Sequence, residues 1–121
     1  MKTLLDNCVA YRAKELFAAH EIQHTSDVGF EALGNGDLIA RASDRFDLLA
    51  TTDKKIRYEQ NLDSLPVSIL ELNTLLTRFA DLQTLTPFLE DALEATKYYR
   101  FVSVGADGKI EKLAPRHSVR D

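Results

Sequence analysis

Short apolar runs alternate with stretches of helical spacing along most of this chain, and this alternation constrains the fold more than any other feature. Strands are predicted from apolar or alternating residues at 3–5, 22–25, 47–52, 67–72 and 98–104, of which 22–25 is the weakest. Each strand except the last is followed by residues that favour a helix. The sequence therefore predicts repeated strand–helix units.

Helices are predicted where apolar residues recur three or four positions apart. Four stripes have this spacing: Val9, Ala13, Leu16 and Phe17; Leu38, Ile39, Ala42 and Phe46; Leu75, Leu76, Phe79 and Leu82; and Leu89, Ala92 and Leu93. The second stripe follows the turn at 34–37, and the fourth follows Thr86 and Pro87, an N-cap and a proline at the first helical position. A further short helix is expected over 54–61.

Strands that alternate with helices of this length need crossover connections, which join parallel strands and place helices against the sheet. We therefore expect an α/β fold with a mainly parallel central sheet covered by helices on both faces. After Gly105, a turn signal precedes a short alternation at Ile110 and Leu113. We interpret 105–114 as a hairpin return and 115–121 as a loose basic tail.

The length and charge of the chain limit the classes of protein that it can belong to. Its 121 residues suffice for one domain with one core. No apolar run approaches the roughly 20 residues that a membrane span requires, no secretory signal is recognisable, and the single Cys8 excludes an intrachain disulfide. We expect a cytoplasmic protein with no membrane association. Because the net charge is −4 at pH 7, a nucleic-acid ligand would need a local basic patch or bound metal ions.

Three aspartates stand at the junctions of predicted elements. Asp6 follows the first strand, Asp37 lies at the start of the second helix, and Asp53 follows the third strand. The carboxyl ends of parallel strands meet at one edge of the sheet, where ligands gather. These acids are therefore candidates for catalysis and for binding Mg²⁺ or Mn²⁺, which prefer carboxylate oxygens. Asp37 and Asp53 have an alternative interpretation as helix caps, whereas Asp6 has no obvious packing role.

Three segments together resemble a PIN-like domain: Leu4-Leu5-Asp6-Asn7, Asp37-Leu38-Ile39, and the run from Phe46 to Leu62, which is the most specific. The resemblance is to small prokaryotic proteins related to toxin-type, VapC-like ribonucleases. It covers residues 1–104 and leaves 105–121 as a C-terminal extension.

This resemblance implies a three-layer α/β/α sandwich and, often, a homodimer. It also implies that Asp6, Asp37 and Asp53 are metal ligands in an enzyme that cleaves RNA with Mg²⁺ or Mn²⁺ and a metal-bound water. Such an enzyme is often a toxin that an antitoxin protein neutralises.

The basic residues beside Asp53 are candidates for RNA contacts. Lys54, Lys55 and Arg57 have the charge to bind phosphates, and Tyr58 has a ring on which a base can stack. The alternatives are a solvated helix face for the cations and ordinary packing for Tyr58.

Several other reactive residue types have simpler interpretations. We interpret Cys8 as a small buried apolar residue, His20 and His24 as surface or hydrogen-bonded histidines, and Asp27 as a turn residue.

Two alternatives to a nuclease stay open. Asn7 and Lys55 stand where many PIN-like relatives carry acids, so the chain is alternatively a catalytically inactive PIN-like module that binds RNA or a partner protein. A metabolic α/β enzyme or nucleotide binder ranks last, because no strand is followed by a glycine-rich phosphate-binding fingerprint.

Overall fold

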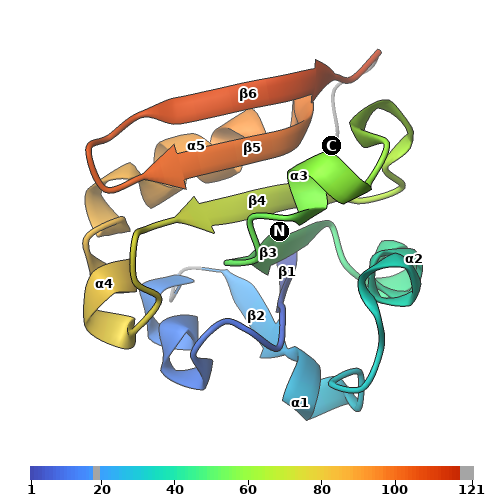
Figure 1. The fold of residues 1–121 in the computed structure, drawn as a ribbon, viewed down its shortest axis with the longest axis horizontal. Coiled ribbons are helices and arrows are strands. Elements are labelled where there is room, and N and C mark those ends of the chain that lie inside the picture. The colour runs from blue at the N-terminus through green and yellow to red at the C-terminus, as the bar shows by residue number, and fades with distance from the viewer. Residues whose placement is uncertain (18–19, 118–121) are drawn as a thin grey trace.

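The computed structural model describes residues 1–17 and 20–117, and in this part of the chain it contains one six-stranded sheet (Figure 1). Its strands are β1 (Lys2–Leu5), β2 (Glu21–His24), β3 (Leu48–Thr51), β4 (Ser68–Asn73), β5 (Tyr99–Gly105) and β6 (Ile110–Pro115). They lie in the order β2-β1-β3-β4-β5-β6; the first five are parallel, and β6 is antiparallel to β5. The expected mixed α/β fold with a mostly parallel sheet is confirmed.

The helices are short, and α2, with 11 residues, is the longest among the described residues. The α-helices are α1 (Thr25–Val28), α2 (Asn35–Arg45), α3 (Ile56–Glu59), α4 (Phe79–Gln83) and α5 (Leu89–Ala95). The 3₁₀ helices are η1 (Tyr11–Phe17), η2 (Leu62–Ser64) and η3 (Thr86–Phe88). In α2 the predicted apolar stripe at Leu38, Ile39 and Ala42 is buried, as periodicity requires. No helix among residues 1–17 and 20–117 is both long and apolar enough to cross a lipid bilayer.

Apolar residues are buried on both faces of the sheet. Because neighbouring strand residues point to opposite faces, Leu48 and Ala50 join one cluster and Leu49 joins another. The first cluster includes residues of η1, α4 and α5, and the second includes residues of α2 and α3. In Figure 1, α5 lies behind β5, whereas α3 lies in front of the sheet. Burial on both faces explains why the parallel strands are nearly continuous apolar runs.

The segment between β4 and α4 differs from the prediction. Leu75 and Leu76 were expected on a buried helical stripe, but they lie before α4 and are 93% and 52% exposed. The Thr74 hydroxyl donates to the Leu76 carbonyl 2.5 Å away, which holds this segment in a turn. The helix begins only at Phe79, where Arg78 and Asp81 form a capping box.

The end of the described chain returns to the sheet. Gly108 takes a φ of 87° in the turn between β5 and β6, a conformation that favours glycine. Pro115 is the last residue of β6, and the Arg116 amide donates to the Tyr98 carbonyl at 2.8 Å. Both are therefore attached to the sheet rather than part of the expected loose tail. Residues 118–121, including Arg120, lie outside the described residues.

Candidate functional site

The strand order creates a switch point between β1 and β3. From β1 the chain passes to β2 on one side, and β3 then lies on the other side of β1. The two connections diverge there, and in open α/β sheets ligands bind beyond the carboxyl ends of the strands at such a point. Asp6 directly follows β1, and Asp53 follows β3 by two residues. Two of the three predicted site acids therefore flank the switch point.

Asp6 is held firmly at this position. Its amide donates to the Ala50 carbonyl at 2.9 Å, which places it opposite the end of β3. Its side chain is only 6% exposed. The Thr51 hydroxyl donates to Oδ2 at 2.8 Å, and the Asn7 amide donates to Oδ1 at 2.6 Å. Asp6 is thus a buried carboxylate with a fixed orientation.

Thr51 also connects Asp6 to Asp53. The Thr51 hydroxyl accepts a hydrogen bond from the Asp53 amide at 3.0 Å while it donates to Asp6. The carboxylate of Asp53 accepts from the Lys55 amide at 2.9 Å and from the Asn35 side chain at 3.2 Å. Thr51 and Asn35 were missed by the sequence prediction. For Thr51 a signal existed, because a hydroxyl residue ended the apolar run before Asp53.

Asp37 is the third predicted acid, and no hydrogen bond among the described residues connects it with Thr51 or Asn35. It is exposed on the first turn of α2, and this end of α2 reaches the site through Asn35 instead. Among residues 1–17 and 20–117, no group of three or more His, Cys, Asp or Glu side chains is arranged to hold a metal ion. Metal binding by Asp6, Asp37 and Asp53 stays a prediction.

Cys8 lies beside Asp6 and Thr51, and the expectation of a buried apolar residue is wrong. It is exposed, and its Sγ lies 3.6 Å from Asp6 Oδ2 and 3.5 Å from the Thr51 hydroxyl oxygen. The residues that follow Asp6 turn the chain outward, which removes Cys8 from the core. A spacing pattern in the sequence does not reveal that turn.

The three predicted RNA-binding cations differ in their surroundings. Lys54 is exposed and its ammonium donates to the Thr74 carbonyl at 2.7 Å, whereas Lys55 is exposed beside Asp53. Arg57 is only 16% exposed in its side chain, so the alternative of a solvated helix face is wrong for this residue. Its guanidinium contacts Glu71 and Glu111, and a phosphate would have to compete with both carboxylates.

Arg57 belongs to a polar row that crosses four strands. The register aligns Thr51 with Glu71, Glu71 with Ser103, and Ser103 with Glu111. Arg57 donates to Oε1 of Glu71 at 3.0 Å and to Oε1 of Glu111 at 2.8 Å, and the Ser103 hydroxyl donates to Oε1 of Glu71 at 2.7 Å. The Arg57 hydrogen bond holds the pKa of Glu111 below its ordinary value.

Glu71 was missed by the sequence prediction. It is 2% exposed, and its Oε2 has no hydrogen-bond partner among the described residues. The signal was present, because Glu71 is the only charged residue in the mostly apolar strand run over 67–72. A buried carboxylate of this kind needs an explanation.

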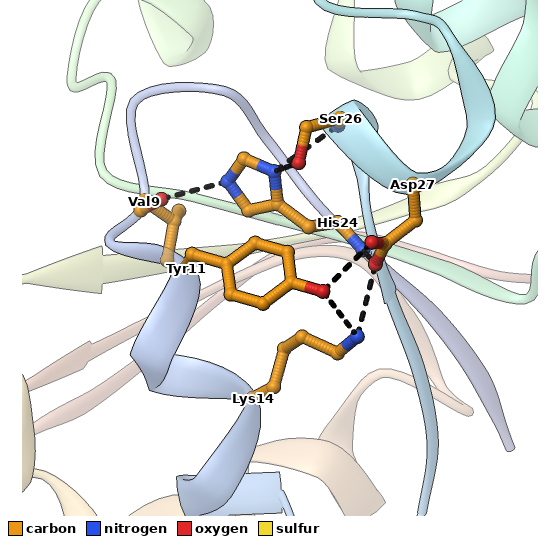
Figure 2. A network of polar contacts seen from close by, with 6 residues as sticks. All are labelled: Val9, Tyr11, Lys14, His24, Ser26 and Asp27. Carbon is orange, nitrogen blue, oxygen red and sulfur yellow. Dashed lines mark hydrogen bonds and ion pairs between the residues drawn. The ribbon is translucent and has the colours of Figure 1, made fainter.

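A second polar network fixes the chain just after Asp6 (Figure 2). His24 lies between Val9 and Ser26: the Ser26 amide donates to Nδ1 at 3.1 Å, and Nε2 lies 2.9 Å from the Val9 carbonyl. Nδ1 is therefore an acceptor, and Nε2 carries the proton that it donates to Val9. This confirms the interpretation of His24 as a hydrogen-bonded histidine. His20 is paired with Glu90 at 2.9 Å.

Asp27 is the other centre of this network. It was expected to be a turn residue, but it completes the capping box of α1. The His24 amide donates to it at 2.9 Å, the Lys14 ammonium at 2.9 Å and the Tyr11 hydroxyl at 2.8 Å. These donors, with His24 contributing most, lower the pKa of Asp27 to about 2. The network joins η1, β2 and α1 beside the loop that carries Cys8 and Val9.

Comparison with protein-family models, with curated proteins and with solved structures finds no match for this chain. The resemblance to PIN-like domains stays a prediction from the residues quoted above.

Proposed function

We propose that this protein is a metal-dependent endoribonuclease with a three-layer α/β/α sandwich of the PIN-like type. One observation carries the proposal: Asp6 and Asp53 follow adjacent parallel strands at the switch point of the sheet, and one hydroxyl, that of Thr51, bonds to both residues. Ligand sites of open α/β sheets lie at this position.

The donor set at this point fits one Mg²⁺ or Mn²⁺ ion. Oδ1 of Asp6 and both oxygens of Asp53 each accept one hydrogen bond from the described residues, and a carboxylate oxygen can accept two. Mg²⁺ is commonly held by one or two carboxylates and several waters, so Asp6 and Asp53 suffice, with Asp37 as a third candidate ligand. When bound, such a cation lowers the pKa of a coordinated water and neutralises charge on a phosphodiester.

The residues around the two aspartates have definable roles in this proposal. Thr51 keeps the buried Asp6 carboxylate in one orientation. Lys54 and Lys55 are exposed beside Asp53 and provide positive charge for RNA phosphates in a protein whose net charge is negative. The same resemblance extends the proposal to a cytoplasmic toxin that a partner antitoxin protein neutralises, acting as a homodimer.

A second candidate function is a catalytically inactive PIN-like module that binds RNA or a partner protein. Two observations favour it. Asn7 and Lys55 replace acids that many PIN-like relatives carry, and no group of three or more His, Cys, Asp or Glu side chains among the described residues is arranged to hold a metal ion.

Cleavage of single-stranded RNA by purified protein separates the two candidates. The nuclease proposal expects cleavage that requires Mg²⁺ or Mn²⁺ and that falls at least about 100-fold in Asp6→Asn and in Asp53→Asn. The matched control is Asp44→Asn, which removes an exposed carboxylate of α2 and is expected to keep wild-type activity. RNA binding without any metal-dependent cleavage would support the inactive module instead.

A further inference from the structure

Glu71 poses a problem that the proposed cleavage site does not solve. Its carboxylate is 2% exposed, Oε1 accepts hydrogen bonds from Arg57 and Ser103, and Oε2 has no partner within residues 1–17 and 20–117. A buried charged oxygen without a donor costs more free energy than a lost surface hydrogen bond. Each such group in a folded protein needs an explanation, and a functional role is one of them.

A small cavity lies at this carboxylate. It has a volume of about 150 Å³ and is lined by Lys54, Arg57, Tyr58, Glu71, Asn73 and Glu111. These residues come from the segment after β3, from α3, and from β4 and β6, beside the end of the sheet that carries Asp53. The cavity therefore adjoins the proposed cleavage site and is too small for more than one planar ring system and its substituents.

We propose that this cavity binds one nucleobase of the RNA and that Glu71 selects guanine there. The inference deepens the proposed function and rests on it, since it assigns base recognition beside the proposed cleavage site. Glu71 Oε2 accepts hydrogen bonds from the Watson–Crick edge of the base, Tyr58 stacks on its face, and Lys54 binds a neighbouring phosphate.

The balance of donors and acceptors selects guanine. Two carboxylates, Glu71 and Glu111, share the guanidinium of Arg57, and the ammonium of Lys54 donates to the Thr74 carbonyl. Oε2 of Glu71 is therefore left as an acceptor without a donor among the described residues. Guanine presents a ring N–H and an amino group side by side. Adenine and cytosine place an acceptor nitrogen beside the amino group, and uracil places its single N–H between two carbonyl oxygens. Only guanine offers two adjacent donors.

Tyr58 provides the stacking surface. Its side chain is 83% exposed, and its ring centroid lies 6.0 Å from the guanidinium carbon of Arg57. An exposed tyrosine has little packing to oppose a movement of its ring. The ring is therefore free to cover the face of a base that enters the cavity.

Binding of free nucleotides tests this inference without requiring cleavage. The four nucleoside 5′-monophosphates and inosine 5′-monophosphate are titrated into the full chain and followed by amide NMR chemical shifts. We expect GMP to bind at least about tenfold more tightly than UMP, and about tenfold more tightly than the inosine nucleotide, which lacks the amino group. The inosine comparison needs no protein variant.

Three variants localise the effect. Glu71→Gln should lose the preference for GMP. Tyr58→Ala should lower the affinity for every nucleotide about tenfold without changing the order of the affinities. Glu59→Gln is the matched control, because Glu59 is an exposed carboxylate of α3 that does not line the cavity, and it should bind as the wild type does. Each variant is first checked for a cooperative thermal transition. Because Tyr58 is so exposed, its variant is expected to fold even if Glu71→Gln does not.

The outcomes separate this inference from the proposed function. Absence of nucleotide binding, equal binding of GMP and UMP, or an unchanged GMP preference in a folded Glu71→Gln protein overturns base selection by Glu71, even if RNA is cleaved. A GMP preference that persists in Asp53→Asn, while RNA cleavage is lost, supports both base selection by Glu71 and the proposed nuclease. A GMP preference without any cleavage supports the base site and contradicts the nuclease.

Discussion

At the scale of single residues, Thr51 connects the two aspartates of the candidate site. Its hydroxyl donates to the buried Asp6 carboxylate and accepts from the Asp53 amide. Replacing it with valine keeps the shape of the side chain and removes both bonds. We expect Thr51→Val to lower the free energy of unfolding by about 1–3 kcal/mol, because Asp6 is left with less hydrogen bonding while still buried.

Thr3 provides a matched control for this prediction. It lies in β1, is fully buried, and its hydroxyl has no hydrogen-bond partner among the described residues. Thr3→Val therefore removes an unsatisfied polar group and should leave stability unchanged or raise it. Urea unfolding of both variants measures the difference. Equal losses of unfolding free energy in the two variants would show that the hydrogen bonds of the Thr51 hydroxyl do not stabilise the fold.

Asp27 makes stability depend on acid pH. Its pKa is lowered from an ordinary value of 3.8 to about 2 by hydrogen bonds from His24, Lys14 and Tyr11. The folded state therefore favours the charged form, so its stabilisation is fully present above pH 3.8 and is lost as the pH falls toward 2. Asp27→Asn removes this contribution and should be less stable than the wild type at pH 7, with a gap that closes toward pH 2.

Urea unfolding at a series of pH values tests this dependence on Asp27. Asp44→Asn, on the exposed side of α2, is the control. Its free energy of unfolding should change with pH in the same way as that of the wild type. A gap between Asp27→Asn and the wild type that stays constant from pH 7 to pH 2 would contradict a role for the charge.

How far the site can be predicted from sequence differs from residue to residue. The approach of Asp6 and Asp53 could be predicted, because both follow apolar runs and parallel strands end at one edge. The partners of Glu71 could not, because Arg57, Ser103 and Glu111 reach it from α3 and two other strands. Such contacts depend on strand register, which a single sequence does not specify.

At the scale of elements, the strands were predictable and the short helices less so. Strands buried on both faces leave continuous apolar runs, whereas one-turn helices carry too few residues for a clear period. The segment at Leu75 and Leu76 is the clearest failure. Its leucines have helical spacing with Phe79 and Leu82, but a threonine turn and a later capping box determine where the helix begins.

The exposure of Leu75 and the burial of Leu82 predict different tolerances to substitution. Leu75→Ser should change the free energy of unfolding by less than about 0.5 kcal/mol, because the side chain is 93% exposed. Leu82→Ala, on α4 and fully buried, should cost about 2–5 kcal/mol. Thermal and urea unfolding of the two variants compare them. A large loss in Leu75→Ser would indicate that this leucine is buried in the folded protein, as the periodicity alone suggested.

At the scale of the whole molecule, the sheet order determines where chemistry can occur. The chain adds β2 on one side of β1 and adds β3, β4 and β5 on the other side, so the switch point of the five parallel strands lies between β1 and β3. Asp6 and Asp53 lie at that switch point, and the polar row from Thr51 to Glu111 extends from it across the sheet. Cleavage and base recognition are thus proposed for neighbouring parts of one edge.

The most direct test of the central claim is a titration of Mg²⁺ and Mn²⁺ into the wild type, Asp6→Asn and Asp53→Asn, with thermal stability and single-stranded RNA cleavage measured in the same samples. A cation that binds only the folded state raises the melting temperature. The account predicts that the wild type gains both thermal stability and cleavage with added metal, and that both aspartate variants lose both responses. Cleavage that persists in the two variants, or a wild type that shows neither response, would contradict a metal-dependent site at Asp6 and Asp53.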